Sequence, residues 1–230
     1  MSQLRSDDFD LREFAGKAAI VAIFSIVAVT KLIALTSLIV DWSNAPTPAR
    51  WVKFAADLAS FVFILIVVGT TFFRYQPRRS AGGFEARFSA LVGTFLALFL
   101  ALLPPANITP GTAMFAVFLI AIGAALSAYV MIWLGRSFSL MPQARELVMT
   151  GPYSIIRHPL YCAEEIAALG VMILLFSPLA VGLIVIHWCF QLRRMVNEER
   201  ILRAEFPEYV DYAVRTPRVL PRVWSRAQPR

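Results

Sequence analysis

Long blocks of apolar residues, rather than a regular alternation of apolar and polar positions, dominate this chain. No Asp, Glu, Lys or Arg occurs from Phe88 to Gly135, and none occurs from Ile166 to Leu192. A helix in water needs a polar face, so uninterrupted apolar runs of this length indicate helices surrounded by lipid. Because backbone groups find no water inside a bilayer, the expected fold class is all-α, a polytopic bundle of transmembrane helices.

The apolar runs divide into about six predicted spans, each near the ~20 residues that cross a ~30 Å hydrocarbon core, although the third and fifth are short. Segments rich in Pro, Gly and Asn separate most of them. Ser177 and Pro178 alone separate the last two spans, so these are expected to form a tight antiparallel hairpin. The predicted spans are residues 18–40, 51–73, 88–103, 112–134, 160–176 and 179–196.

Composition agrees with a single membrane domain over residues 1–230. Hydrophobic residues make up 58% of the chain and charged residues 16%, whereas a soluble domain carries about 25% charged residues. These values exclude a soluble globular enzyme, a disordered chain and a disulfide-stapled secreted domain. Cys162 and Cys189 have no CxxC spacing, so neither a disulfide framework nor a metal cluster is expected.

Basic residues predict the orientation of the bundle. The chain has 22 Lys and Arg against 15 Asp and Glu, a formal net charge of +7. Arginines gather in the loops 74–87 and 135–159 and in the tail from Arg193 onward, whereas the loop 104–111 has no charge. The positive-inside tendency then places the basic segments and both termini in the cytoplasm. The basic residues are assigned to topology and to contact with membrane lipids, and no nucleic-acid partner is expected.

Polar residues inside the predicted spans include Lys31, Asp57 and His187. Lys31 and Asp57 occupy the first two spans, where a charge indicates either a functional site or a structural pair between neighbouring helices. His187 lies in the middle of the sixth span, and we expect it to face the bundle and to hydrogen-bond a neighbouring helix.

Residues capable of chemistry concentrate between positions 135 and 230, after the four spans of residues 1–134. Arg157 and His158 stand just before Pro159, at the predicted start of the fifth span, where free backbone N–H groups favour an anionic group. Glu198 and Glu199 follow about one turn beyond the sixth span. A hairpin of two spans brings residues 158 and 198 to the same end, so donors and carboxylates meet at a site suited to a zwitterion such as an amino acid moiety.

Structural explanations of the same residues stay open beside this one. Arg157 could be a topology-determining residue and His158 a helix cap. Glu198 and Glu199 could belong to a solvated helix face, paired with Arg194 and Arg203 at i,i+4 spacing.

A combined pattern runs through the last part of the chain. Its residues are Gly151, Pro152, Tyr153, Arg157, His158, Pro159, Tyr161, Glu198, Glu199, Leu202, Phe206, Tyr209, Tyr212 and Pro221. This pattern resembles the isoprenylcysteine carboxyl methyltransferase family of integral membrane enzymes, which is related to phospholipid methyltransferases. The resemblance covers about residues 136–222, and the four N-terminal spans match only as apolar helices. The chain departs from the family at Cys162-Ala163-Glu164-Glu165, where the family often has Gly, and at Phe206-Pro207, where it commonly has Phe-Gly.

The resemblance implies methyl transfer from S-adenosylmethionine to a lipidic or small-molecule acceptor, with residues 135–230 as the cofactor-binding catalytic region. It implies that His158 and Tyr161 contact the methionine part of the cofactor, and that Glu198 or Glu199 lies near its amino group. The implied catalytic residues are Arg157, Glu198 and Glu199. The implied cofactor-binding residues are Gly151, Pro152, Tyr153, His158, Pro159, Tyr161, Glu198, Glu199, Tyr209 and Tyr212.

Within this interpretation the methyl acceptor stays open between a prenylated cysteine carboxylate, a small thiol, a phospholipid amine and another lipid. O-methyl transfer is favoured over S- or N-methyl transfer. A second interpretation is a membrane reductase of the sterol type that uses NADPH. A third is a non-catalytic transporter or scaffold, which would favour polar residues at mid-membrane and an internal repeat.

Overall fold

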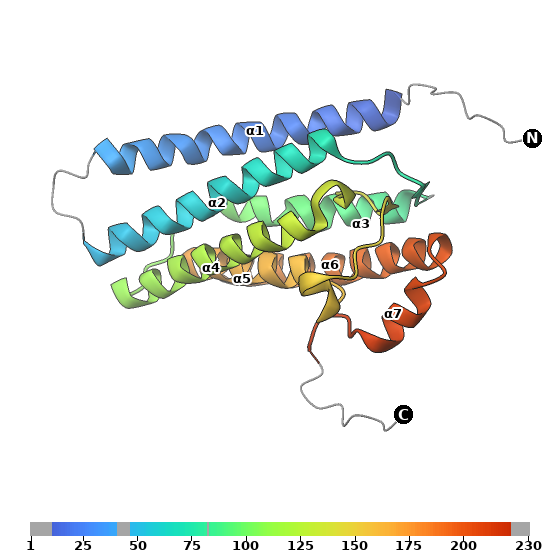
Figure 1. Cartoon of the computed structure of the whole chain (residues 1–230). Helices are drawn as coiled ribbons and strands as arrows, with labels where there is room; N and C mark the ends of the chain where they lie inside the picture. The colour runs from blue at the N-terminus through green and yellow to red at the C-terminus, as the bar shows by residue number, and fades with distance from the viewer. Residues whose placement is uncertain (1–10, 41–46, 82, 222–230) are drawn as a thin grey trace, which may run out of the picture.

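The computed structural model describes residues 11–40, 47–81 and 83–221, and within them it is a bundle of long helices (Figure 1). The all-α prediction is confirmed, with one small antiparallel pair of two-residue strands added. The elements in chain order are α1 (Leu11–Val40), α2 (Pro48–Phe73), β1 (Arg79–Ser80), α3 (Phe84–Phe95), the 3-10 helix η2 (Leu96–Leu102), α4 (Pro110–Leu134), η3 (Gly135–Ser137), β2 (Gln143–Ala144), η4 (Gly151–Ser154), α5 (Pro159–Leu174), α6 (Pro178–Glu205) and α7 (Tyr209–Arg215).

Local sequence explains where the long helices begin. α2, α4 and α6 each start with a proline that follows Thr47, Thr109 or Ser177, whose hydroxyl accepts a backbone N–H of the first turn. A capping hydroxyl satisfies a free N–H, and proline at the first helical position loses no hydrogen bond. α5 starts in the same way at Pro159, but His158 makes no side-chain cap, which leaves its ring available for other contacts.

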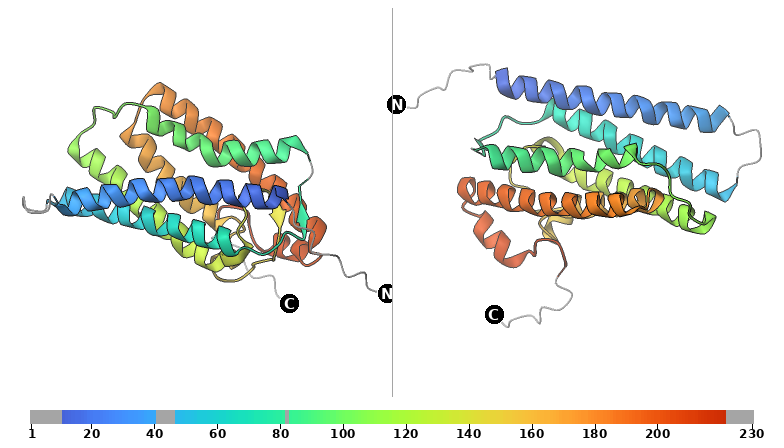
Figure 2. Two further views of the ribbon diagram at one scale, coloured as in Figure 1. Left: turned by 90° about the horizontal axis from the view of Figure 1, so that it is seen from above. Right: turned by 180° about the vertical axis from the view of Figure 1, so that it is seen from behind.

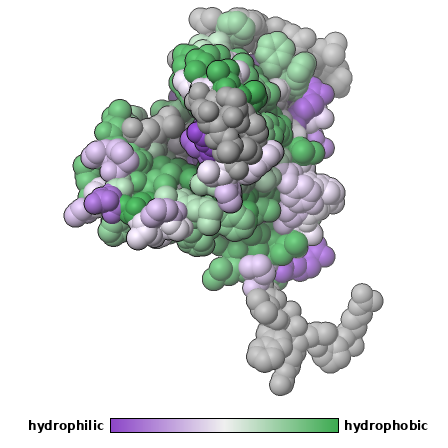
Figure 3. Space-filling view, turned by 90° about the vertical axis from the view of Figure 1, so that its left-hand side faces the viewer, coloured by the Kyte–Doolittle hydropathy of each residue, from purple (hydrophilic) through white to green (hydrophobic). Residues whose placement is uncertain are grey.

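The six predicted spans are all helical, and four of them meet the length and hydropathy expected of a membrane-crossing helix: Phe14–Val40, Pro48–Phe73, Pro110–Ser137 and Pro178–Glu205. The other two are short, because α3 has 12 residues before it tightens into η2, and α5 has 16. A crossing by all six therefore stays a prediction. Large hydrophobic side chains such as Ile33, Phe72 and Ile132 are exposed on the helices, as a lipid environment favours. Seen from one end of the bundle, hydrophobic and hydrophilic side chains are mixed on the surface (Figure 3).

The basic loops gather at one end of the bundle. The segment after α2 contains β1 and the segment after α4 contains β2. The two strands pair at this end, with Arg79 opposite Ala144. α7 lies at the same end, whereas the turn between α5 and α6 lies at the other (Figures 1 and 2). The grouping of basic segments agrees with the predicted topology, and their assignment to the cytoplasm stays a prediction.

The last two spans do not pack as the tight hairpin that the sequence suggests. Residues 175–177 do make a short turn, but α5 packs mainly on α4 and α6 mainly on α3, while α5 and α6 approach each other closely at few backbone positions. Small residues explain the preference for α4, because Gly123 and Gly170 allow the two helices to touch. Side chains, rather than backbones, therefore bridge α5 and α6.

The charged and polar residues inside the spans form pairs. Lys31 Nζ lies 2.9 Å from Asp57 Oδ1, and Lys53 Nζ lies 2.7 Å from Asp57 Oδ2, so the structural pair is the interpretation that fits α1 and α2. His187 Nε2 lies 2.9 Å from Glu165 Oε1 on α5, which confirms the expected hydrogen bond to a neighbouring helix.

We expect Gly123→Ala to destabilise the bundle at the α4–α5 contact. A Cβ at position 123 would lie 2.4 Å from the Ala167 backbone nitrogen, and overpacking of this kind costs about 1–3 kcal/mol. Gly69→Ala on α2 is the matched control, because no atom lies within 4 Å of its added Cβ. Thermal melting in detergent, followed by circular dichroism, should show a lower Tm for the first variant alone. Equal melting temperatures would contradict this account of the helix contact.

Candidate functional site

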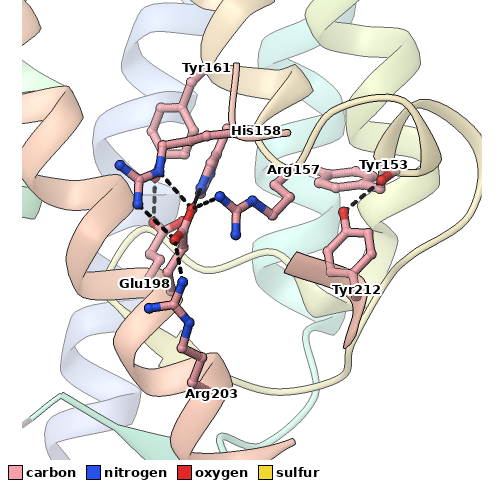
Figure 4. A network of polar contacts seen from close by, with 9 residues as sticks. Tyr153, Arg157, His158, Tyr161, Glu198, Arg203 and Tyr212 are labelled. Carbon is pink, nitrogen blue, oxygen red and sulfur yellow. Dashed lines mark hydrogen bonds and ion pairs between the residues drawn. The ribbon is translucent and has the colours of Figure 1, made fainter. Parts of the chain in front are cut away.

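The start of α5, the end of α6 and the segment after α7 converge at one end of the bundle. The segment after α7 runs back along the residues before α5, where the Arg157 N–H donates to the Pro217 carbonyl at 2.9 Å and the His158 N–H to the Arg218 carbonyl at 3.1 Å. These backbone bonds fix the position of the C-terminal segment. They also place side chains from three distant parts of the sequence next to each other (Figure 4).

Glu199 is the centre of a buried cluster of charges. Its side chain is 1% exposed, and its Oε1 lies 3.1 Å from His158 Nε2 and 3.4 Å from Arg157 Nη2. Arg218 donates to both carboxylate oxygens, from Nε at 2.8 Å and from Nη2 at 2.9 Å. Arg203, one turn along α6, lies 3.4 Å from Oε2. This hydrogen bonding to Glu199 raises the pKa of the Arg218 guanidinium, so the pair is held in its ionised form.

Glu198 faces a different group of side chains. The Tyr161 hydroxyl donates to Glu198 Oε1, which also accepts from Arg194 Nε at 3.2 Å. The Arg194 guanidinium lies over the Tyr161 ring at 4.9 Å and donates to Thr94 Oγ1 at 3.0 Å. The two successive glutamates are therefore divided, one into the buried charge cluster and the other beside Tyr161.

Three tyrosines support the same region. The Tyr212 hydroxyl on α7 donates to the Tyr153 carbonyl at 2.6 Å, which ties α7 to η4 (Figure 4). Burial raises the pKa of Tyr212 to about 12 and also raises the pKa of Tyr153 and of Tyr209. These hydroxyls are therefore protonated at neutral pH and can act as donors.

The turn at Gly151 needs glycine for two reasons. Its φ is +58°, a region that L side chains rarely adopt, and a Cβ there would lie 2.5 Å from the Trp133 ring. The indole of Trp133 thus packs directly on the backbone of the turn. Gly151 and Pro152 set the path of the loop, and Tyr153 is the member of the turn whose side chain reaches the cavity described next.

A cavity lies between these elements, with apolar and polar walls. Its lining combines apolar side chains such as Leu134, Phe138 and Leu160 with charged and hydroxyl groups. Among the described residues, the Tyr209 hydroxyl and Arg157 Nε are buried without a hydrogen-bond partner. The polar lining consists of Ser137, Ser139, Gln143, Arg145, Glu146, Tyr153, Arg157, His158, Tyr161, Glu164, Arg194, Glu198, Tyr209 and Tyr212.

Most of the predicted site residues meet at this cavity. Those that line it are Tyr153, Arg157, His158, Tyr161, Glu198, Tyr209 and Tyr212, whereas Gly151, Pro152, Pro159 and Glu199 are outside its lining. The i,i+4 pairs of Glu198 with Arg194 and of Glu199 with Arg203 are present as well, although Glu199 and Arg194 are buried rather than solvated.

Two contributions were not predicted from the sequence. Arg218 binds the Glu199 carboxylate. It lies in a segment without a sequence motif, and nothing in the sequence distinguishes it from the other arginines of the C-terminal tail. Glu164 lines the cavity from α5, one turn after Tyr161. The signal for Glu164 was its departure from the resembling family, which marks the position without assigning it a role.

A second cavity shares part of its lining with the first. Gly16, Ile20 and Ile23 of α1 line it together with Leu91 and Phe95. Arg74 and Arg87 also line it, and Met141 and Gln143 belong to both cavities. The segment around β2 therefore forms a shared wall between the two cavities.

Comparison with known proteins shows which family the site region is similar to. The isoprenylcysteine carboxyl methyltransferase family matches residues 115–204, which include α5 and nearly all of α6. The chain is similar to protein-S-isoprenylcysteine O-methyltransferase B of Arabidopsis thaliana, with 34% identity over 114 residues, 46% of this chain and 58% of that protein. It is also similar to a nickel-cobalt-cadmium resistance protein of Alcaligenes xylosoxydans xylosoxydans, with 34% identity over 82 residues, 35% of this chain and 38% of that protein.

The chain thus spans 38% and 58% of the length of these two relatives. The family match, residues 115–204, contains the part of the structure in which His158, Tyr161, Glu198 and Glu199 converge. This part of the chain is therefore similar to the isoprenylcysteine carboxyl methyltransferase family.

Proposed function

We propose that the protein is an integral membrane methyltransferase that takes its methyl group from S-adenosylmethionine and transfers it to a lipidic or small acceptor. The observation that carries the proposal is the convergence of His158 and Tyr161 from α5 with Glu198 from α6 on one cavity, inside the family segment. The similarity to the Arabidopsis O-methyltransferase favours a carboxylate as the acceptor group.

The cavity suits the donor by its chemistry. A nucleoside with an amino acid moiety needs an apolar wall, hydrogen-bond donors and a carboxylate for its ammonium group. The apolar wall is present, Tyr209 and Arg157 offer buried donor atoms without partners among the described residues, and Glu198 offers a carboxylate. We therefore place the amino group near Glu198, the carboxylate near Arg157 and His158, and the nucleoside beside Tyr153, Tyr209 and Tyr212.

The reaction requires little acid–base catalysis by the protein. Bound there, S-adenosylmethionine supplies a methyl group on a positively charged sulfur, ready for in-line displacement. A carboxylic acid with a pKa of ~3.3–3.7 reaches the site already ionised. Alignment of the two reactants then carries most of the rate enhancement. Arg157 lines the cavity while Glu199 holds it from behind, so its guanidinium is positioned to orient an anionic acceptor.

The second cavity supports a lipidic acceptor. Its lining includes apolar side chains of α1 and α3, and it shares Met141 and Gln143 with the first cavity. An alkyl or prenyl chain held between α1 and α3 would leave its polar end near the shared wall. We propose this chamber for the chain of the acceptor.

Calorimetry on the full chain in detergent tests the proposal. We expect S-adenosylmethionine and S-adenosylhomocysteine to bind and NADPH not to bind. Methyl transfer from labelled donor to N-acetyl-S-farnesylcysteine, a small thiol or phosphatidylethanolamine then identifies the acceptor class. Binding of NADPH without binding of either adenosyl ligand would favour the reductase and overturn the proposal.

A further inference from the structure

α5 presents two successive glutamates to different surroundings. Glu165 turns toward α6, where its Oε1 lies 2.9 Å from His187 Nε2 and its Oε2 accepts from the Trp188 indole. Glu164 turns toward the cavity and lines it. Neighbouring residues on a helix point about 100° apart, since the helix has 3.6 residues per turn. α5 therefore places the Glu164 carboxylate in the cavity lining and the Glu165 carboxylate, at the next position of the helix, outside it.

The groups around Glu164 place two carboxylates beside one guanidinium. Arg194 is the cation next to Glu164, but its Nε contacts Glu198 Oε1 at 3.2 Å and its Nη1 donates to Thr94. Among the described residues, the Glu164 carboxylate has no hydrogen bond or ion pair within 4.0 Å. The other two arginines of the cavity lining, Arg145 and Arg157, have partners of their own. When Glu164 and Glu198 are both ionised, these two carboxylates and Arg194 together carry one negative charge.

We propose that Glu164 selects the positively charged methyl donor over the product that has lost its methyl group. The inference rests on the proposed function and assigns a role to a residue that the family pattern does not contain. The donor carries an ammonium, a carboxylate and a sulfonium, so its net charge is +1. Methyl transfer breaks the bond between sulfur and the methyl carbon and leaves the electron pair on sulfur, so the product is neutral overall.

Complementary charge explains how one residue can make this distinction. The donor brings the single positive charge that Glu164, Glu198 and Arg194 together lack, and the product does not. Attraction between opposite charges is several times stronger in a partly buried site than in bulk water. Glu164 is only partly exposed and faces the cavity. It therefore strengthens donor binding more than product binding, and it favours release of the product after each turnover.

Calorimetry with three forms of the full chain in detergent tests the inference. The ligands are S-adenosylmethionine and S-adenosylhomocysteine, and the proteins are the wild type, Glu164→Gln and the control Glu165→Gln. We expect Glu164→Gln to weaken binding of S-adenosylmethionine about 10-fold or more and that of S-adenosylhomocysteine by less than about 3-fold. Glu165→Gln should leave the ratio of the two dissociation constants at its wild-type value, because Glu165 lies outside the cavity lining.

Each other outcome counts against the inference. An equal loss of both ligands would mean that Glu164 binds a group they share, and no change in either would mean that it does not act on the donor. If Glu164→Gln fails to fold, Glu164→Asp keeps the charge and should keep the preference, and its loss would contradict the proposal. A wild type that binds neither ligand defeats the proposed function itself, whereas a wild type that binds both with an unaltered ratio in Glu164→Gln defeats this inference alone.

Discussion

Glu199→Ala is expected to lower the melting temperature of the protein by about 10 °C and to abolish binding of the methyl donor. The side chain is 1% exposed and is the shared partner of Arg157, His158, Arg203 and Arg218. Removing one member of a buried ion pair leaves uncompensated charge and costs about 3–5 kcal/mol, and for a chain of this size each kcal/mol shifts Tm by about 2–4 °C. Thermal melting in detergent and calorimetry measure the two effects.

Glu205→Gln is the control for this variant. Glu205 pairs with Arg79 at 3.2 Å, and the two side chains are 23% and 53% exposed. Exposed pairs contribute about 0–1 kcal/mol, so its Tm should stay near that of the wild type. Glu199→Gln combined with Arg218→Gln should recover part of the loss, because one stranded cation is removed. Equal losses for Glu199→Ala and Glu205→Gln would contradict a central role for the buried carboxylate.

The helices follow from the sequence because their causes are local. Uncharged apolar runs fix the spans, and the pairs Thr47-Pro48, Thr109-Pro110 and Ser177-Pro178 fix where helices begin. The packing partner of α5 does not follow in the same way. From Ile166 to Leu174, α5 is apolar on all sides, and such a surface has no apolar stripe that selects one neighbouring helix. The close approach of α4 and α5 depends on where Gly123 and Gly170 fall in three dimensions.

The candidate site follows only in part. The hairpin connection predicts that the start of α5 meets the end of α6, and His158 indeed contacts Glu199 at 3.1 Å. Glu198 and Glu199 make different contacts because of the rotation of α6 about its axis, and tertiary packing determines this rotation. The position of Arg218 depends on a chain reversal after α7. The backbone hydrogen bonds that hold this segment involve no sequence motif.

Glu198→Gln should weaken binding of S-adenosylhomocysteine about 10- to 100-fold and change Tm little. This result would contrast with Glu199→Ala, for which a large fall in Tm is expected. Glu198 lines the cavity and accepts from the Tyr161 hydroxyl and from Arg194 Nε. The glutamine carbonyl has nearly the same shape and can still accept both bonds. The variant loses the negative charge that we place beside the amino group of the ligand, and a hydrogen bond to a charged group contributes about 1.5–3 kcal/mol.

Glu208→Gln, at an exposed position just before α7, is the control for this variant and should bind as the wild type does. Comparing Glu198→Gln with Glu199→Gln then separates ligand binding from structural support, because the two positions are adjacent and the chemical change is identical. Binding lost with Tm retained at position 198, and Tm lost at position 199, is the pattern that the geometry predicts. The reverse pattern would place the ligand on the Arg218 side of α6 and would require a different site.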